Sequence, residues 1–299
     1  MYCLQGLLML MKRFFVGLLF VVSLPYLSYA QGFLRNSDLG VDCGLMTYIG
    51  DLNNQSMFGT PHFAYGFNYR YRFDDRWSLA LTAAKGAMSG GNPDCIPMRN
   101  LDFTSPVYEA TARAEFNFAM FDVVSPFYYW TPFIFVGLGG LYFNPMTQYT
   151  NPVDGSVTWV ELQPLGTEGQ TIRSVESNGK YSRFQITMPF GMGAKFRLSE
   201  KVVLTAEYGF RKTWTDYLDD VSTTYVGSDL FPNTENGRLA AELADRTSEQ
   251  VPGYENAPGD KRGDDSLDDW YAYANVSLSV NMDLLFGWMR KPRCNDNNK

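Results

Sequence analysis

Long apolar runs are scarce in this chain of 299 residues. Beyond residue 30 there is no uninterrupted apolar stretch of about 18 residues, the length that a membrane-spanning helix requires, which excludes helical insertion into a membrane. Histidine is almost absent, with His62 alone, and the four cysteines do not have the spacing of a zinc site. The chain also lacks a P-loop and a glycine-rich dinucleotide fingerprint. These absences exclude the common nucleotide-binding motifs and a cysteine-based zinc centre.

Cysteine supplies little covalent constraint. Cys3 belongs to the N-terminal leader, Cys43 to a predicted strand, Cys95 to a predicted long loop and Cys294 to the C-terminal tail. Because the three later cysteines lie at different depths of the predicted fold, we expect no internal disulfide. An intermolecular bridge through Cys294 stays open.

The N-terminus has the layout of a secretory signal peptide. A basic pair precedes the apolar run FFVGLLFVVSLPYL, and a small-residue cleavage site ends at Ala30. We therefore expect residues 1–30 to direct export and Gln31 to begin the mature chain, with Met11 as an alternative start. No cysteine follows the cleavage site, which argues against a lipid-anchored lipoprotein.

Aromatic residues and glycine are abundant while charge is sparse. The chain is 16% aromatic and 19% charged and has 27 glycines, a composition that favours a β-rich protein. The clearest pattern is HFAYGFNYRYRF at residues 62–73, in which every second residue is aromatic. Side chains alternate across a strand with period 2, so this strand has one aromatic face and one small, polar or cationic face.

Seven further segments alternate in the same way. They are residues 39–49, 77–86, 107–118, 132–143, 182–198, 202–214 and 270–283. The links between them are short at residues 74–76 and 199–201, intermediate at 119–131, and long at 50–61, 87–106, 144–181 and 215–269. An even number of strands with short turns at one end and long loops at the other is typical of an outer-membrane barrel.

The sequence thus predicts an all-β fold, a transmembrane antiparallel up-and-down β-barrel of eight strands with long extracellular loops and short periplasmic turns. We expect the barrel to occupy residues 31–286 and a periplasmic tail to occupy 287–299, with outer-membrane lipid around the aromatic faces. A soluble sandwich or lipocalin-like barrel is the alternative, because alternation alone does not say which face points inward. Mixed charges on the polar faces favour the membrane barrel.

Eight strands enclose an interior that side chains just fill. We therefore predict an inner salt-bridge network and no wide channel. The network would consist of Arg70, Arg72, Glu109, Arg113, Glu115, Lys195, Glu207 and Arg211.

Negative charge is concentrated in one loop. Without residues 1–30 the chain has 23 basic and 32 acidic residues, net −9, and residues 215–269 alone hold 14 acids and 4 bases, net −10. We predict a solvated acidic surface loop that binds no nucleic acid. Oxygen ligands for Ca²⁺ are the alternative, from Asp216, Asp219 and Asp220 or from Asp260, Asp264, Asp265, Asp268 and Asp269, although the spacing is not that of an EF-hand. We expect no metal and no cofactor.

His62 is the only candidate for acid–base catalysis. It lies at the loop end of the predicted strand 62–73, where a lipid-modifying barrel enzyme could place a catalytic histidine. Such chemistry needs a serine and a carboxylate within hydrogen-bonding reach, and the sequence gives no sign of that meeting. We predict a rim or lumen histidine and a protein that is not an enzyme.

Several loop segments resemble the PorG-like outer-membrane barrels of Bacteroidetes. They are YIGDLN at residues 48–53, LQPLGTEGQ at 162–170, YSRFQITMPFGMGAKFRLS at 181–199 and above all TDYLDDVSTTYV at 215–226. The family motif within the last of these is Asp216, Tyr217, Leu218, Asp219 and Asp220. The resemblance implies a structural part of the type IX secretion system, which contacts a periplasmic ring of the lipoprotein PorK with PorN and supports protein export.

A ring below the membrane would meet the short turns, the segment 31–38 and the basic tail. The candidate partner residues are Asp74, Asp75, Arg76, Phe127, Tyr128, Tyr129, Trp130, Ser199, Glu200, Lys201, Arg290, Lys291 and Arg293. The four aromatic residues among them are equally consistent with an interfacial aromatic belt. The motif at 216–220 lies on the opposite side of the membrane, where it would order the outer loop or meet another outer-membrane component. A related barrel acting as an adhesin remains the alternative, and a lipid-modifying enzyme is a weaker one.

Overall fold

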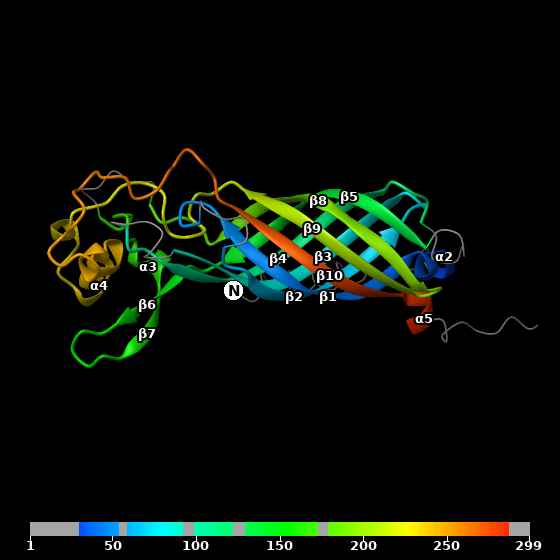
Figure 1. Ribbon diagram of the computed structural model, residues 1–299, viewed down its shortest axis with the longest axis horizontal. Coiled ribbons are helices and arrows are strands. Elements are labelled where there is room, and N and C mark those ends of the chain that lie inside the picture. Colours follow the sequence, from blue (N-terminus) through cyan, green and yellow to red (C-terminus); the bar gives the residue numbers. More distant parts are fainter. Residues whose placement is uncertain (1–29, 54–58, 92–98, 122–128, 173–178, 287–299) are drawn as a thin grey trace, which may run out of the picture.

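The computed structural model describes residues 30–53, 59–91, 99–121, 129–172 and 179–286. Eight antiparallel strands form a closed barrel, seen from the side in Figure 1. These strands are β1 (Ser37–Ile49), β2 (His62–Arg72), β3 (Trp77–Gly90), β4 (Phe103–Asn117), β5 (Trp130–Phe143), β8 (Phe184–Ser199), β9 (Val202–Thr213) and β10 (Trp270–Asn281). Each strand pairs with the next barrel strand along the chain, and β10 returns to pair with β1, so the barrel has no open edge.

The eight predicted strands are confirmed, with differences at their ends. The largest lie at β3, which ends at Gly90 instead of residue 86, and at β4, which begins at Phe103 instead of residue 107. Proline cannot donate to a strand ladder, so Pro106 is an unfavourable residue within this segment of β4. In the structure Pro106 sits opposite Ala87, and the pairing of β3 with β4 continues past it to Phe103.

The apolar face of the barrel points outward. Phe63, Phe67 and Leu138 are each more than half exposed, and many other large apolar side chains at alternate positions along the strands are also exposed. The intervening polar side chains are buried in the lumen. This orientation is opposite to that of a soluble barrel and matches strands that face lipid.

Charged side chains fill the lumen in pairs. Glu115 lies 2.8 Å from Arg70 Nε and 2.7 Å from Lys195 Nζ, and Arg113 binds Glu207 through two contacts of 2.6 and 2.7 Å. The remaining predicted members also pair, Arg211 with Glu109 and Arg72 with Asp38. The predicted inner network is therefore confirmed.

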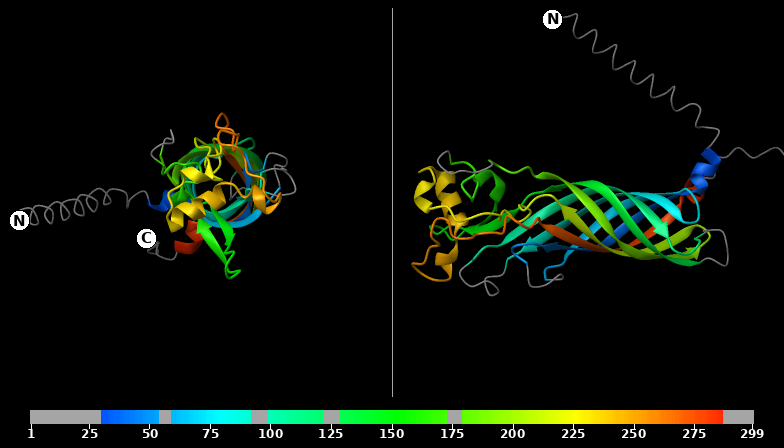
Figure 2. Two further views of the ribbon diagram at one scale, coloured as in Figure 1. Left: turned by 90° about the vertical axis from the view of Figure 1, so that its left-hand side faces the viewer. Right: turned by 90° about the horizontal axis from the view of Figure 1, so that it is seen from above.

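The long loops form a folded cap over one end of the barrel, at the left of Figure 1. The predicted loop 144–181 contains a hairpin of β6 (Met146–Thr150) and β7 (Val157–Glu161) and the short helix α3 (Leu162–Leu165). The predicted loop 215–269 contains η2 (Ser228–Leu230), α4 (Glu235–Ala244) and η3 (Thr247–Glu249). The end-on view in Figure 2 shows α4 and its neighbouring loops lying across the barrel mouth.

One hydrophobic cluster joins the cap to the end of the lumen that the cap covers. Barrel residues and cap residues are buried together in it, so the cap packs on the barrel as part of the same core. Its members include Met46, Tyr48, Phe103, Leu141, Phe143, Leu162, Leu218, Val221 and Leu243.

The opposite end carries the short turns and two short helices, α2 (Ala30–Arg35) and α5 (Met282–Phe286). The side chain of Asn281 in β10 donates to the Arg35 carbonyl at 2.7 Å, which ties α2 to the barrel end. None of the helices in the described part of the chain is long and apolar enough to cross a membrane. We refer below to the capped end and the turn end of the barrel.

Candidate functional site

The motif at residues 216–220 follows β9 closely and packs where the cap meets the barrel. Leu218 is fully buried in the hydrophobic cluster, and Asp219 and Asp220 are 1% and 0% exposed. The prediction of a solvated acidic loop is therefore wrong for this segment. The sequence could not show it, because the partners of these carboxylates come from other loops.

A single hydroxyl joins two of the buried carboxylates. Tyr48 Oη lies 2.6 Å from Asp219 Oδ2 and 2.7 Å from Asp269 Oδ1. A tyrosine hydroxyl has one proton and donates to only one of them, so the second short contact requires a proton on a carboxyl group. The backbone fixes both acids, since Val221 N donates to Asp219 and Leu218 N donates to Asp269, each at 2.9 Å.

Burial changes the acidity of this group. It raises the pKa of Asp219 to about 7 and raises that of Asp269 well above its usual range, because a carboxylate loses its hydration there. Burial also raises the pKa of Asp216 to about 8 and of Asp220 to about 6. The cap thus holds protons at pH values where exposed aspartates have none.

Asp220 connects the motif to the loop at residues 144–181. It has a positive φ of 67°, a backbone conformation that costs energy for a residue with a Cβ. The carboxylate accepts hydrogen bonds from Thr167 at 2.5 Å and from Tyr181 at 2.7 Å. These bonds hold the strained turn in place, and Tyr181 also stacks on Tyr217 with ring centroids 4.8 Å apart.

A buried ion pair completes the connection. Arg262 donates to Glu168 at 2.9 Å and to the Asp220 carbonyl at 2.6 Å, and it is almost wholly buried. Glu168 also accepts from the backbone of Ser222 and Thr223 at 2.8 and 3.1 Å. The motif thus ties residues of β1, of the loop at 144–181 and of the loop at 215–269 into one polar network inside the cap.

Calcium binding finds no support in this arrangement. Within the described residues, no group of three or more acidic, histidine or cysteine side chains is placed to hold a metal ion. Asp219 and Asp269 contact Tyr48 and Asp220 contacts Tyr181, while Asp260, Asp265 and Asp268 are exposed on the cap surface and Asp264 is half-exposed there.

The predicted turn residues lie together at the other end. Asp74, Asp75 and Arg76 are exposed between β2 and β3, and Ser199 at the end of β8 is exposed with Glu200 and Lys201 in the turn to β9. Asp74 accepts from the backbone of Arg76 and Trp77 at 2.8 and 2.7 Å, which shapes the first turn. These rigid turns present charges of both signs to the solvent.

Aromatic residues surround the turn end. Tyr129 and Trp130 are both exposed, and Trp130 stacks on Phe196 of β8 with ring centroids 6.5 Å apart. This stacking makes Trp130 part of the outward face, as an interfacial belt requires. The other predicted partner residues, Phe127, Tyr128, Arg290, Lys291 and Arg293, lie outside the described residues, as do the signal segment 1–29, Cys95 and Cys294.

His62 meets a serine. Its Nε2 lies 2.7 Å from Ser89 Oγ at the capped end of β2 and β3. Among the described residues, no carboxylate is hydrogen-bonded to the ring, so the pair lacks the group that would orient a catalytic histidine.

Comparisons with known proteins agree with this architecture. A model of the outer membrane protein beta-barrel domain matches residues 14–229. The chain belongs to this family. A search of curated proteins found no match.

Solved structures with a similar chain path include other outer-membrane barrels. Ail, the attachment invasion locus protein of Yersinia pestis, is 11% identical, with 82% of this chain and 96% of that chain covered and a TM-score of 0.37. Neisserial surface protein A is 10% identical, with 82% and 97% covered and a TM-score of 0.38. OprG from Pseudomonas aeruginosa is 11% identical, with 83% and 97% covered and a TM-score of 0.36.

Membership of the outer membrane protein beta-barrel domain family fixes the surroundings of each part. The protein lies in the outer membrane. Because short turns of such barrels face the periplasm, the turn end is periplasmic and the capped end is extracellular. The buried network therefore organises an extracellular structure, while the exposed turns and α2 face the periplasm.

Proposed function

We propose that this protein is a structural component of a type IX secretion system, a PorG-like barrel of the Bacteroidetes kind that catalyses no reaction. Its periplasmic end contacts a ring of PorK-like and PorN-like proteins, and this contact supports the export of other proteins. The observation that carries the proposal is the DYLDDVS segment at residues 216–222. It carries the resemblance, and its buried side chains hold the extracellular cap together.

The packed lumen favours a structural role over a role as a passage for cargo proteins. Paired charges from Arg70, Glu115, Lys195, Arg113 and Glu207 occupy the barrel interior, and the cap covers its outer mouth. A folded cargo protein needs a far wider passage than an eight-stranded barrel. The surfaces left for partners are the periplasmic turns, the lipid-facing strands and the outside of the cap.

The first test is to isolate the tagged full chain from gently solubilised outer membranes and identify what comes with it. Recovery of a periplasmic lipoprotein ring at fixed stoichiometry is expected, together with loss of exported proteins when the gene is deleted. Recovery of the barrel alone, with export intact after deletion, would overturn the proposal.

Two double variants separate the periplasmic from the extracellular side. Asp75→Lys with Glu200→Lys reverses two exposed turn charges whose side chains shape neither turn. Asp265→Lys with Asp268→Lys makes the same charge change on the exposed surface of the cap. We expect the first to lower ring recovery and export, and the second to leave both unchanged. Equal effects would contradict a periplasmic contact.

An adhesin is the second candidate, because the cap is a folded extracellular body with a pocket of its own. This alternative predicts that export survives deletion of the gene while attachment to a surface or cell is lost. A lipid-modifying enzyme predicts that His62→Ala abolishes lipid hydrolysis and leaves folding intact. We expect no such activity, because the described part of the chain offers the His62–Ser89 pair no carboxylate partner.

A further inference from the structure

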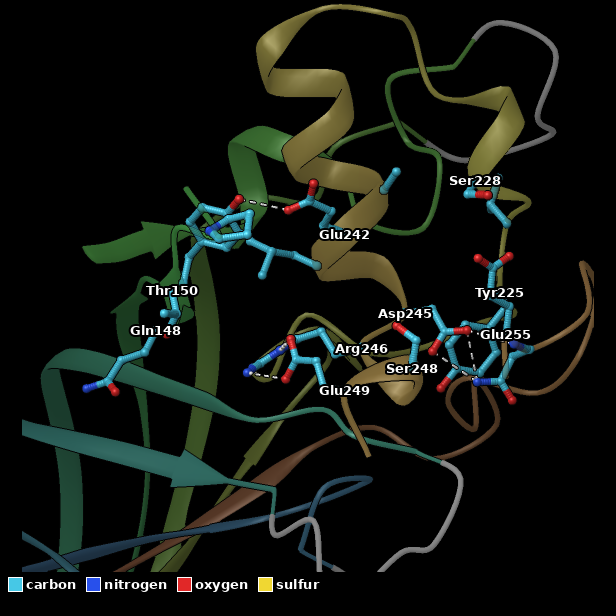
Figure 3. A pocket seen from close by; sticks show the side chains of 16 residues that line it. Gln148, Thr150, Tyr225, Ser228, Glu242, Asp245, Arg246, Ser248, Glu249 and Glu255 are labelled. Atoms are coloured by element: carbon cyan, nitrogen blue, oxygen red, sulfur yellow. Dashed lines mark hydrogen bonds and ion pairs between the residues drawn. The ribbon is translucent and has the colours of Figure 1, made fainter. Parts of the chain in front are cut away.

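The extracellular cap has a pocket of about 550 Å³ between the β6–β7 hairpin and the segment that runs from α4 through η3. Figure 3 shows this pocket with Glu242, Asp245 and Glu255 around it. The volume lies within the range of small-ligand sites in proteins. It lies away from the periplasmic turns, and Tyr225 in its wall is within electrostatic range of Arg262 of the buried network.

The pocket is strongly acidic. Glu242, Asp245, Glu249 and Glu255 line it, and among the described residues Arg246 is the single basic residue in its wall. The guanidinium of Arg246 is already engaged, since it pairs with Glu249 at 3.0 Å and also with Asp102. The wall therefore has an excess of negative charge that its own cation does not balance.

The four carboxylates differ in how many hydrogen bonds and ion pairs they already make. Asp245 accepts from Asn256 N at 2.7 Å and Thr247 N at 3.0 Å, and Glu242 accepts from Tyr149 Oη at 2.8 Å. Glu255 is exposed and has no ion-pair partner among the described residues. A cation that enters the pocket could pair with the Glu255 carboxylate and would also be attracted by the other carboxylates of the wall.

Tyr225 gives the independent sign of a ligand. It lines the pocket and is only 4% exposed, yet its hydroxyl has no hydrogen-bond partner within the described part of the chain. Its backbone is fixed, because Tyr225 N donates to Asp260 O and Tyr225 O accepts from Gly259 N, both at 2.9 Å. A buried polar group without a partner is costly, so this hydroxyl is available to a ligand that reaches it through the pocket.

We propose that this pocket binds a cationic amine or guanidinium group, presented by a basic segment of an extracellular peptide or protein. The ammonium of a lysine side chain would pair with Glu255 and donate a hydrogen bond to the Tyr225 hydroxyl. Its methylene stem would lie against the tyrosine rings of the wall, Tyr149 and Tyr225, where cation–π attraction adds to packing. Anionic ligands are excluded by the charge of the wall.

The test measures binding of a fluorescent peptide, Gly-Lys-Gly-Lys-Gly, to the full chain in detergent. The same peptide with acetylated lysines is the matched control, because acetylation removes the charge and keeps the stem. We expect the acetylated peptide to bind at least about tenfold more weakly, as the loss of a charged hydrogen bond implies. Equal binding of the two peptides, or no binding of either, would overturn the proposal.

Variants of the protein locate the site. We expect Glu255→Gln to weaken the lysine peptide about tenfold. Asp265→Asn removes one charge from the exposed surface of the same loop outside the pocket and should change binding less than twofold. Equal weakening by both variants would mean general attraction to an acidic loop, which would contradict a defined site.

Tyr225→Phe supplies a second readout. Because the hydroxyl is unpartnered without ligand, its removal should leave the stability of the cap unchanged or raise it, while weakening the peptide by several-fold. A loss of cap stability would show that the hydroxyl already has a protein partner and would sink this step.

Free n-butylammonium in competition distinguishes the source of the cation. Displacement only at concentrations far above the peptide's favours a protein segment, and displacement at equal concentration favours a small amine. Either outcome retains the cationic site, and failure to displace at any concentration contradicts it. The result is independent of the secretion role, which is read at the periplasmic end.

Discussion

At the scale of single residues, the hydroxyl of Tyr48 decides the protonation of the cap. It lies between Asp219 and Asp269, and burial raises the pKa of both carboxyl groups. In the unfolded chain an aspartate titrates near pH 4, so between about pH 4 and 7 the folded cap binds protons that the unfolded chain has released. The stability of the cap is therefore fully present at low pH and falls as pH rises through the folded pKa values.

Hydrogen exchange measures this loss directly. We expect the protection of the Leu218 and Val221 amides to fall by up to about tenfold per pH unit for each bound proton, after correction for the chemical exchange rate. Protection that stays constant from pH 5 to 8 would contradict a proton shared in this group.

Asp219→Asn should remove most of this pH dependence. The amide nitrogen can donate to Tyr48 Oη, which leaves the tyrosine proton for Asp269, so that every contact is satisfied without an added proton. We expect amide protection at pH 8 that equals or exceeds that of the natural chain. Asp265→Asn, an exposed change in the same loop, is the control and should leave the pH profile as it was.

Arg262 is the second residue on which the cap depends. Arg262→Met leaves Glu168 buried without its cation, a change that costs about 3–5 kcal/mol in buried ion pairs. We expect the cap to become sensitive to protease while the barrel keeps its resistance to unfolding in detergent. Arg238→Met, at an exposed position of α4, should have no effect, and addition of Glu168→Gln to Arg262→Met should restore part of the loss.

At the scale of elements, the lipid-facing strands and the cap respond differently to charge. Leu138, in the middle of β5, is 61% exposed, and Leu267, in the cap, is 67% exposed. Arginine at the midplane of an outer-membrane barrel costs about 2–4 kcal/mol, whereas the cap surface meets water. We expect Leu138→Arg to lower the denaturant midpoint of refolding into lipid vesicles and Leu267→Arg to leave it unchanged. Equal midpoints would contradict a lipid-facing position for Leu138.

The strands and the cap also differ in how far the sequence could predict them. Alternation is a local property, so the strand predicted at residues 62–73 appears as β2 at 62–72. The β6–β7 hairpin has its own signal, two short alternating stretches around the turn NPVDGS, but each stretch is only five residues long. The burial of Asp219 was hidden, because its partner Tyr48 is 171 positions away in the chain.

At the scale of the whole molecule, the barrel is closed twice, by its own side chains and by the cap. Arg113 lies over the ring of Phe135 and Lys195 over that of Phe133, so the cations of the lumen pack against aromatic rings as well as carboxylates. The lumen is therefore a packed core in its own right. The side chains of the lumen should therefore keep the barrel closed whether or not the cap is present.

Planar bilayer conductance tests this expectation. We expect the full chain to form no stable open channel, and we expect the same of a variant in which a short Gly/Ser linker replaces residues 215–269. The reason is that the ion pairs of Glu115 with Arg70 and of Arg113 with Glu207 lie within the strands and do not depend on the cap. Refolding of the variant is checked by its shift in electrophoretic mobility on heating, and a general porin serves as the positive control. A large steady conductance after removal of the cap would mean that the cap, and not the lumen network, closes the barrel.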